Sequence, residues 1–554
     1  MHYNQKIWIG DSDGEKVCIC PKMANRHGLI AGATGTGKTI TLKVLAESFS
    51  DAGVPVFLAD VKGDLSGMCR PGTDSENMQE RIRRFGLSDC GFAYQSYPAV
   101  FWDIYGKTGI PLRTTISEMG PLLLSRLMDL NDTQTDILTI VFRIADEEEL
   151  LLIDTKDLKA MLTYVSEHNK EYAEQYGNIA KQSIGAILRG VTALEAQGGE
   201  QFFGEPGLNI ADWFVNGMDG KGAINILDCR ELMQNSTMYA TFLLWMLSEL
   251  FETLPEVGDM DKPRMVFFFD EAHLLFKDIS KTLRAKIEQV VKLIRSKGVG
   301  IYFITQSPKD IPDEVLGQLG NKIQHALRAY TPSDEKAVKA AAAAFRPNPD
   351  FDTKEMLTSL GTGEALISVL DEDGVPGIVK RCRILPPQSL MGAVEEDVRK
   401  QEAVRNNLYL KYQNMEDRDS AYEFFQRLKQ QNARDAEAAA KAAEEAKAAK
   451  AAEKEAARQA AAEAKAKEKA AAAEAKRIEK EEAEKARKAA KEQEKREKAV
   501  KSGMKSVANT AAGTIGRELG NTIGQSVGGS FGKKLGGNLG ASLGRSILGT
   551  FLKL

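Results

Sequence analysis

Residues 32–39 have the composition and spacing of a loop that binds phosphate groups. The segment reads Gly-Ala-Thr-Gly-Thr-Gly-Lys-Thr and directly follows the apolar run Leu29–Ala31. Glycines let backbone N–H groups turn toward an anion, a lysine at the Lys38 position reaches the β- and γ-phosphates of a nucleotide, and a hydroxyl at the Thr39 position binds Mg²⁺. The residues that we expect to bind the nucleotide are Gly32, Ala33, Thr34, Gly35, Thr36, Gly37, Lys38 and Thr39.

Two adjacent acids provide the second half of such a site. Asp270 and Glu271 follow the apolar run Met265–Phe269, which has the pattern of a buried strand. One acid in this place holds the metal ion that accompanies the phosphates, and its neighbour acts as general base on the attacking water. We assign the metal to Asp270 together with Thr39, and the general base to Glu271. These residues predict hydrolysis of ATP with Mg²⁺.

Polar residues also follow two further strand patterns. Gln306 comes directly after Ile301–Thr305, and Asp60, Lys62 and Asp64 lie at the end of a run that starts at Val56. Ligands bind at the carboxyl ends of the strands in an open α/β sheet, so these residues lie on the ligand edge. Gln306 has the position of a γ-phosphate sensor, although a glutamine that merely starts a loop is the alternative. The other three residues receive no role beyond membership of the site.

The elements that must hold these residues are those of an α/β domain. Apolar or β-branched runs alternate with helical patterns across residues 1–390, which favours a mainly parallel sheet covered on both faces. At about residues 115–216 the pattern changes to consecutive amphipathic helices, which we interpret as a helical insertion. The expected strands are Leu29–Ala31, Val56–Ala59, Ala223–Leu227, Met265–Phe269, Ile301–Thr305 and Ala365–Val369.

The chain changes character after residue 390. Residues 391–434 predict a helical connector, and residues 435–500 consist almost entirely of Ala, Glu, Lys and Arg. Glu and Lys at i,i+4 spacing favour a single solvated helix, roughly 100 Å long at about 1.5 Å per residue. Large apolar residues are missing from heptad positions, which argues against a coiled coil. A charged linker without fixed structure is the alternative.

Residues 501–554 predict a glycine-rich helical tail. Glycine recurs at every fourth position from Gly516 to Gly544, and an apolar residue precedes each one. On a helix this spacing gives a groove of small residues that lets a partner helix approach closely. We expect the tails to associate with one another. Reversible contact with a membrane surface and an unstructured tail are the alternatives, and the charged residues disfavour a membrane span.

Composition and net charge restrict the cellular location and the binding partners that we expect. The net charge of −4 gives no global basic field, so DNA would have to be bound by a local surface. The six cysteines lack the paired spacing of a zinc site and predict reduced thiols. The N-terminus lacks an apolar signal core, and no uncharged apolar run reaches the roughly 18 residues of a membrane span, so we expect a cytoplasmic protein.

Several ordered segments resemble the ATPase domain of the HerA/FtsK superfamily of hexameric DNA translocases. Besides the phosphate loop they are FFFDEAH (267–273), LIRSKGVGIYFITQSP (293–308), LGNKIQHALRAYTPSD (319–334) and LGTGEALISV (360–369). The segment ADVKGDLSG (59–67) narrows the resemblance to the bacterial HerA-helicase-like, or YjgR-type, ATPases. The resemblance covers about residues 5–390.

The resemblance implies a RecA-like fold, a hexameric homo-oligomer with ATP between subunits, and hydrolysis coupled to translocation or unwinding of DNA. It implies that Gln306 is the γ-phosphate sensor. It also implies that Arg295 is the arginine finger given to the neighbouring subunit, with Arg328 as the second candidate.

Two other functions are compatible with the sequence. A nucleotide-switched scaffold would use the tail for association and would hydrolyse ATP slowly, without a response to DNA. A protein-remodelling ATPase would act on a polypeptide, as in conjugative coupling proteins of the same superfamily. Residues 270–273 also spell the box of DEAH-type helicases, but the downstream motifs of that family are absent, so we interpret His273 as a packing residue.

Overall fold

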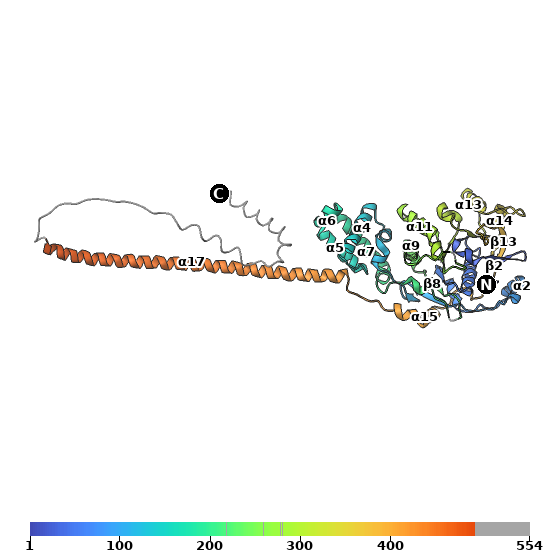
Figure 1. The fold of residues 1–554 in the computed structure, drawn as a ribbon, viewed down its shortest axis with the longest axis horizontal. Coiled ribbons are helices and arrows are strands. Elements are labelled where there is room, and N and C mark those ends of the chain that lie inside the picture. Colours follow the sequence, from blue (N-terminus) through green and yellow to red (C-terminus); the bar gives the residue numbers. More distant parts are fainter. Residues whose placement is uncertain (218, 259, 278, 280, 494–554) are drawn as a thin grey trace. The chain divides into compact units, whose positions relative to one another are not determined.

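The computed structural model describes residues 1–493 except residues 218, 259, 278 and 280 (Figure 1). It divides into two units, Met1–Ala440 and Lys441–Leu554. The glycine-rich segment 501–554, with its predicted self-association and membrane contact, lies outside the described residues. Among the residues that are described, no helix is both long and apolar enough to cross a membrane.

A single sheet of 13 strands runs through the first unit. Eight neighbouring strands are parallel, as expected for an α/β domain whose strands are joined by helices. In spatial order they are β11 (Asn321–His325), β4 (Gly28–Ala31), β10 (Val299–Thr305), β9 (Met265–Phe269), β5 (Val56–Asp60), β8 (Ile224–Asp228), β6 (Ala99–Asp103) and β7 (Ile110–Pro111). The predicted fold class, a mainly parallel RecA-like α/β core, is confirmed.

An antiparallel segment extends the sheet beyond β11. Its strands are β12 (Glu364–Ser368), β13 (Lys380–Ile384), β2 (Lys6–Ser12), β1 (His2–Tyr3) and β3 (Glu15–Ile19). The sequence analysis did not identify the other seven strands, which are β1, β2, β3, β6, β7, β11 and β13. In β3 and β13, charged residues interrupt the apolar pattern. The strands that it did predict are all present, with ends that differ by at most two residues.

Among the described residues, six α-helices between β7 and β8 form the helical insertion, and Figure 1 shows α4–α7 grouped together. Polar capping starts several of them: the Thr115 and Asn131 side chains each accept a hydrogen bond from the backbone three residues later, which satisfies a free N–H of the first turn. The helices are α3 (Ile116–Leu127), α4 (Asp132–Glu147), α5 (Thr155–Glu167), α6 (Asn169–Tyr176), α7 (Lys181–Leu194) and α8 (Glu200–Phe202).

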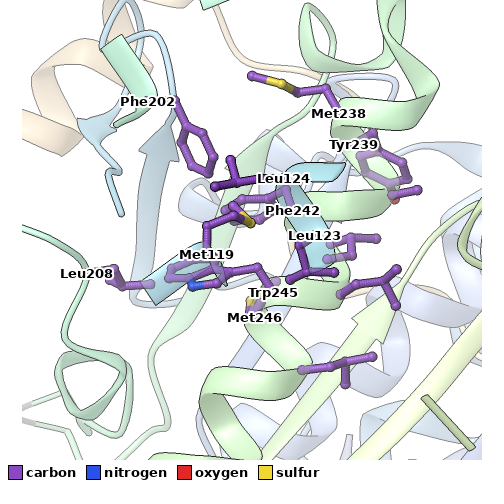
Figure 2. Packing of buried hydrophobic residues seen from close by; sticks show 14 of the residues in the cluster. Met119, Leu123, Leu124, Phe202, Leu208, Met238, Tyr239, Phe242, Trp245 and Met246 are labelled. Atoms are coloured by element: carbon purple, nitrogen blue, oxygen red, sulfur yellow. The ribbon is translucent and has the colours of Figure 1, made fainter. Parts of the chain in front are cut away.

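The largest hydrophobic cluster joins this insertion to the sheet. Met119, Leu123 and Leu124 of α3 pack against α9 (Ser236–Thr253), whose buried residues Phe242 and Trp245 lie between the insertion and the strands (Figure 2). Removing such large side chains from water is the main favourable term in folding. The cluster therefore holds the insertion and the sheet together as one folded unit.

Shorter helices connect the remaining strands. The helix after the phosphate loop is α1 (Lys38–Asp51). The others are α2 (Glu76–Arg84), α10 (His273–Phe276), α11 (Lys281–Leu293), α12 (Asp313–Leu316), α13 (Pro332–Ala343) and α14 (Thr353–Ser359).

Residues 388–425 form a segment that we call the C-terminal strap. It contains α15 (Glu396–Arg405), α16 (Asn407–Tyr412) and the first turn of α17 (Ala421–Gln493). The ring of Tyr412 contacts Trp102 of β6 edge-on at 5.5 Å, and Phe425 stacks on Tyr164 of α5 at 4.5 Å. The strap therefore touches both the sheet and the insertion. The Ala, Glu and Lys residues up to position 493 continue in α17 as a helix.

A buried histidine fixes the start of strand β4. The backbone N–H of Ile301 donates to Nδ1 of His27 at 3.0 Å, so Nε2 carries the proton and donates to the carbonyl of Val291 at 2.9 Å. Burial lowers the pKa of His27 from 6.5 to about 4, and the charge of Arg295 acts in the same direction. The ring is therefore neutral in the folded protein near neutral pH.

We predict that His27→Gln will change the pH dependence of stability. Below pH 6.5 the unfolded wild-type chain binds a proton at His27 that the folded protein does not bind until about pH 4. The stability advantage of wild type over His27→Gln should therefore shrink by about 3 kcal/mol between pH 7 and pH 4. Urea midpoints of both proteins across this range measure the difference, and a constant gap would contradict the assignment.

Candidate nucleotide-binding site

The phosphate loop is shaped by glycines with positive φ angles. Gly32 has φ 155° and Gly37 has φ 114°, and Gly37 is the N-terminal cap of α1. A Cβ on Gly32 would lie only 2.5 Å from the Cβ of His325, so a side chain has no room there. The loop therefore depends on glycine both for its backbone conformation and for its close approach to β11.

Lys38 is held by the loop itself. Its ammonium donates hydrogen bonds to the carbonyls of Gly32 at 2.6 Å and Ala33 at 3.1 Å. Burial lowers the pKa of Lys38, while the carboxylates of Asp270 and Glu271 act in the opposite direction. The lysine thus lies against the loop, with two acids close enough to affect its pKa.

Asp270 is positioned by its backbone and by helix α9. Tyr239 of α9 donates a hydrogen bond to the Asp270 carbonyl at 2.6 Å, and the N–H of Glu271 donates to Asp270 Oδ1 at 2.9 Å. The pKa of Asp270 is raised to about 6, mainly by burial and then by the charge of Glu271, while Lys62 and Lys38 act against this rise. A buried carboxylate of this kind favours a cationic ligand.

Glu271 has a left-handed backbone, with φ 48°, which is unusual for a residue other than glycine. Among the described residues, its Oε2 atom is buried without a hydrogen-bond partner. Nδ1 of His273 lies 3.3 Å from this atom, a distance short enough for an ion pair but without hydrogen-bond alignment. The interpretation of His273 as only a packing residue was therefore incomplete, because the turn at Glu271 brings the two side chains together.

Six of the predicted nucleotide-binding and catalytic residues converge on one pocket. Its lining consists of Thr34, Lys38, Thr39, Leu42, Lys62, Asp270, Glu271, Ile304 and Gln306. Strand order explains the convergence: β10, which ends before Gln306, lies between β4 and β9, with Thr305 beside Ala31 and Phe303 beside Phe269. Parallel strands end at the same edge, so the polar residues that follow them lie together.

The oxygen ligands in this pocket fit Mg²⁺ that is bound together with phosphates. Mg²⁺ in nucleotide sites takes one or two protein oxygens and fills its remaining positions with phosphate and water. Thr39 and Asp270 supply one hydroxyl and one carboxylate in the pocket lining. No group of three or more His, Cys, Asp or Glu able to hold a metal occurs in the described part of the chain, and all six cysteines are free.

The two arginine candidates lie outside this pocket. Arg295 is exposed in the turn Ile294–Lys297, which precedes β10, whereas the pocket lies after β10. A strand of seven residues spans roughly 23 Å. Arg295 is therefore too distant to reach the pocket of its own chain. Arg328 follows β11 at the pocket edge of the sheet, but its guanidinium donates to the carbonyl of Thr358 at 3.0 Å.

His325 is a residue of the site that the sequence analysis did not identify. Its Nδ1 donates to the carbonyl of Glu364 at 2.9 Å, so Nε2 accepts a hydrogen bond from Thr41 of α1 at 2.8 Å. Burial lowers its pKa to about 4. This neutral ring supports both the start of the phosphate loop and the first turn of α1. No signal in the sequence indicated it, because the apolar pattern of the strand that His325 ends is interrupted by Asn321, Lys322 and Gln324.

Comparison with known proteins places the chain among HerA-like proteins. The family model described as "Helicase HerA-like C-terminal" matches residues 5–535. The chain is similar to a DNA double-strand break repair helicase HerA of Sulfolobus acidocaldarius, with 23% identity over 366 residues, 65% of each chain. It is also similar to a probable helicase of Methanocaldococcus jannaschii, with 33% identity over 360 residues, 62% of this chain and 60% of that protein.

The matched segment spans less than two thirds of the length of these relatives. Among solved structures, VirB4 of Thermoanaerobacter pseudethanolicus is 17% identical with a TM-score of 0.42, covering 68% of this chain and 96% of that chain. The family model covers most of the sequence and includes the phosphate loop and both acids. The chain therefore belongs to the HerA-like helicase C-terminal family, within the HerA/FtsK superfamily of P-loop ATPases.

Proposed function

We propose that this protein hydrolyses ATP with Mg²⁺ and couples hydrolysis to translocation along DNA or to its unwinding. The observation that carries the proposal is the shared pocket of Lys38, Thr39, Asp270, Glu271 and Gln306. These residues come from three neighbouring strand ends and supply a phosphate-binding lysine, two metal ligands, a general base and a γ-phosphate contact.

Each side chain in the pocket has a physical reason for its proposed role in ATP hydrolysis. The loop N–H groups and Lys38 bind the phosphates, with Lys38 exchanging its present carbonyl partners for phosphate oxygens. Oε2 of Glu271 has no hydrogen-bond partner among the described residues and is available to accept a proton from water. Gln306 donates to the γ-phosphate. Thr39 and Asp270 would hold Mg²⁺, which would supply positive charge beside the phosphates.

DNA as the second substrate is proposed from the relatives, which are named as helicases. A ring of subunits is proposed because Arg295 is exposed and lies far from its own pocket, so only a neighbouring subunit can receive it. The alternative is a nucleotide-switched scaffold. One observation favours the scaffold. The described part of α17 beyond the strap is exposed along nearly its whole length, as expected of a spacer.

The first prediction from the proposed function concerns steady-state ATP hydrolysis by the purified chain. We expect ATP turnover that double-stranded DNA stimulates several-fold, and we expect Glu271→Gln to lower turnover at least about 100-fold while ATP still binds. Phosphate release measured with and without DNA tests both parts. Turnover that is lost in Glu271→Gln but is indifferent to DNA would favour the switched scaffold. Equal turnover in both proteins would contradict the assignment of the site.

The second prediction concerns Arg295. If it acts in the pocket of a neighbouring subunit, Arg295→Ala should lower turnover about 10³-fold without changing oligomer size or ATP affinity. Added Lys38→Ala subunits, which cannot hydrolyse but carry Arg295, should restore part of the activity in mixed oligomers. Turnover at the wild-type rate by oligomeric Arg295→Ala would exclude this role, and Arg328→Ala would then be the variant to measure.

The third prediction concerns His325, whose ring supports the loop without touching the pocket. His325→Ala leaves the Thr41 hydroxyl and the Glu364 carbonyl without this partner and opens a cavity, which should cost about 2–4 kcal/mol of stability. Because the loop is then less well fixed, ATP affinity should fall more than the turnover at saturation. Thermal melts and ATP titrations measure the two effects. An unchanged melting temperature would show that the ring does not support the loop.

A further inference from the structure

Lys62 is a cation in the pocket that the proposed reaction has not used. It lines the pocket together with Lys38, Thr39, Asp270, Glu271 and Gln306, and it is exposed. Across residues 1–493, leaving out the four gaps, Lys62 forms neither a hydrogen bond nor an ion pair. Its charge acts on both Asp270 and Lys38. The ammonium group is therefore near the reacting region and is free to bind an anion.

The turn that carries Lys62 is fixed by several hydrogen bonds. Asp60, at the end of β5, accepts from the N–H of Gly63 at 2.7 Å and from that of Leu65 at 3.3 Å. Gly63 has φ 83°, and its carbonyl accepts from the Ser66 hydroxyl at 2.8 Å. These contacts close a tight loop with Lys62 at its outer side. The loop holds the Lys62 backbone in one place, so ligand binding has to order only the side chain.

Arg399 of the C-terminal strap binds this turn from the other side. Its Nη2 donates to Asp60 Oδ2 at 3.4 Å and to the carbonyl of Gly63 at 3.1 Å, while Nη1 donates to Asp228 Oδ2 at 2.6 Å. The Arg399 and Asp60 side chains are 3% and 1% exposed. A buried arginine with two carboxylates and a carbonyl is a fixed structural group, because removing any partner leaves a charge uncompensated. The strap therefore determines where the Lys62 turn lies.

We propose that Lys62 binds the γ-phosphate of ATP in cis and stabilises the charge that develops on it during transfer, and that Arg399 is the positioning residue that holds Lys62 there. This inference rests on the proposed ATPase function. Lys38 enters the pocket from the loop that follows β4, whereas Lys62 follows β5, on the other side of the strand that ends at Asp270 and Glu271. The pocket then presents one cation from each side.

The chemistry of the transferred group favours this assignment. In phosphoryl transfer the charge spreads over the outer oxygens of the γ-phosphate, and a cation aimed at them acts mainly in the transition state. ADP lacks these oxygens. A residue that binds the γ-phosphate therefore distinguishes ATP from ADP, whereas a lysine that only balances Asp270 and Glu271 affects both nucleotides alike.

The test measures binding and turnover of Lys62→Ala in the full chain. The expected results are about a 10-fold weaker affinity for a non-hydrolysable ATP analogue, an unchanged affinity for ADP, and turnover that falls about 100-fold. The matched control is Lys107→Ala, since Lys107 is also an exposed lysine at this edge but is paired with Glu231 at 2.6 Å. Lys107→Ala should behave as wild type in all three measurements.

Three results would overturn the assignment of Lys62: an equal loss of affinity for both nucleotides, no loss for either, or turnover at the wild-type rate. Failure of the proposed function gives a different result. If wild type and Glu271→Gln release phosphate equally slowly, the ATPase assignment fails, while the comparison of analogue and ADP still reports on Lys62. If wild type binds neither nucleotide, both proposals fail.

A double-mutant cycle tests Arg399. Arg399→Lys keeps the charge but loses the planar fork that reaches Asp60, Asp228 and Gly63 together, so we expect turnover about 10-fold lower. In the Lys62→Ala background the same change should have no further effect, because a positioning residue acts only through the residue it holds. If the effects of Arg399→Lys and Lys62→Ala on turnover multiply in the double mutant, Arg399 acts independently of Lys62. Asp228→Asn, which removes one partner of Arg399, repeats the cycle if Arg399→Lys does not fold.

Discussion

The close packing of the phosphate loop on strand β11 is the constraint on which the site depends. Gly32 approaches His325 so closely that a Cβ would lie 2.5 Å from the histidine Cβ. The same ring binds Thr41 and the Glu364 carbonyl, and this pattern requires its neutral form. Protonation would remove the acceptor for Thr41 and would place a second positive charge beside Lys38. The shape of the loop and the charge in the pocket are thus set by one buried side chain.

The electrostatics of the pocket follow from burial rather than from paired charges. Burial raises the pKa of Asp270 to about 6 and lowers that of Lys38, so each group is less stable in its charged form than it is in water. A ligand that carries both phosphate oxygens and a divalent cation supplies the charges that these groups lack. Burial therefore makes the charged forms of these groups unfavourable until such a ligand binds. Strongly shifted pKa values of this kind are typical of functional sites.

Sequence patterns predicted the parts of the site that depend on neighbouring residues. Asp270 and Gln306 each follow an apolar run, and the parallel order that places these run ends at one edge follows from the α/β pattern. His325 and Arg399 had no such signal, because their partners Thr41 and Asp60 lie 284 and 339 residues away in the chain. The contact of His273 with Glu271 depends on a left-handed φ at Glu271, a conformation that no residue type at this position predicts.

The C-terminal strap gives the site a physical link to the rest of the first unit. Arg399 binds the turn after β5, Tyr412 packs on Trp102 of β6, and Phe425 stacks on Tyr164 of the insertion. Packed contacts of this kind transmit a displacement only where each member has two arrangements. The hydrogen bonds of Arg399 and of the Lys62 turn hold both in one arrangement, so the strap fixes the position of the Lys62 backbone and does not move with the nucleotide.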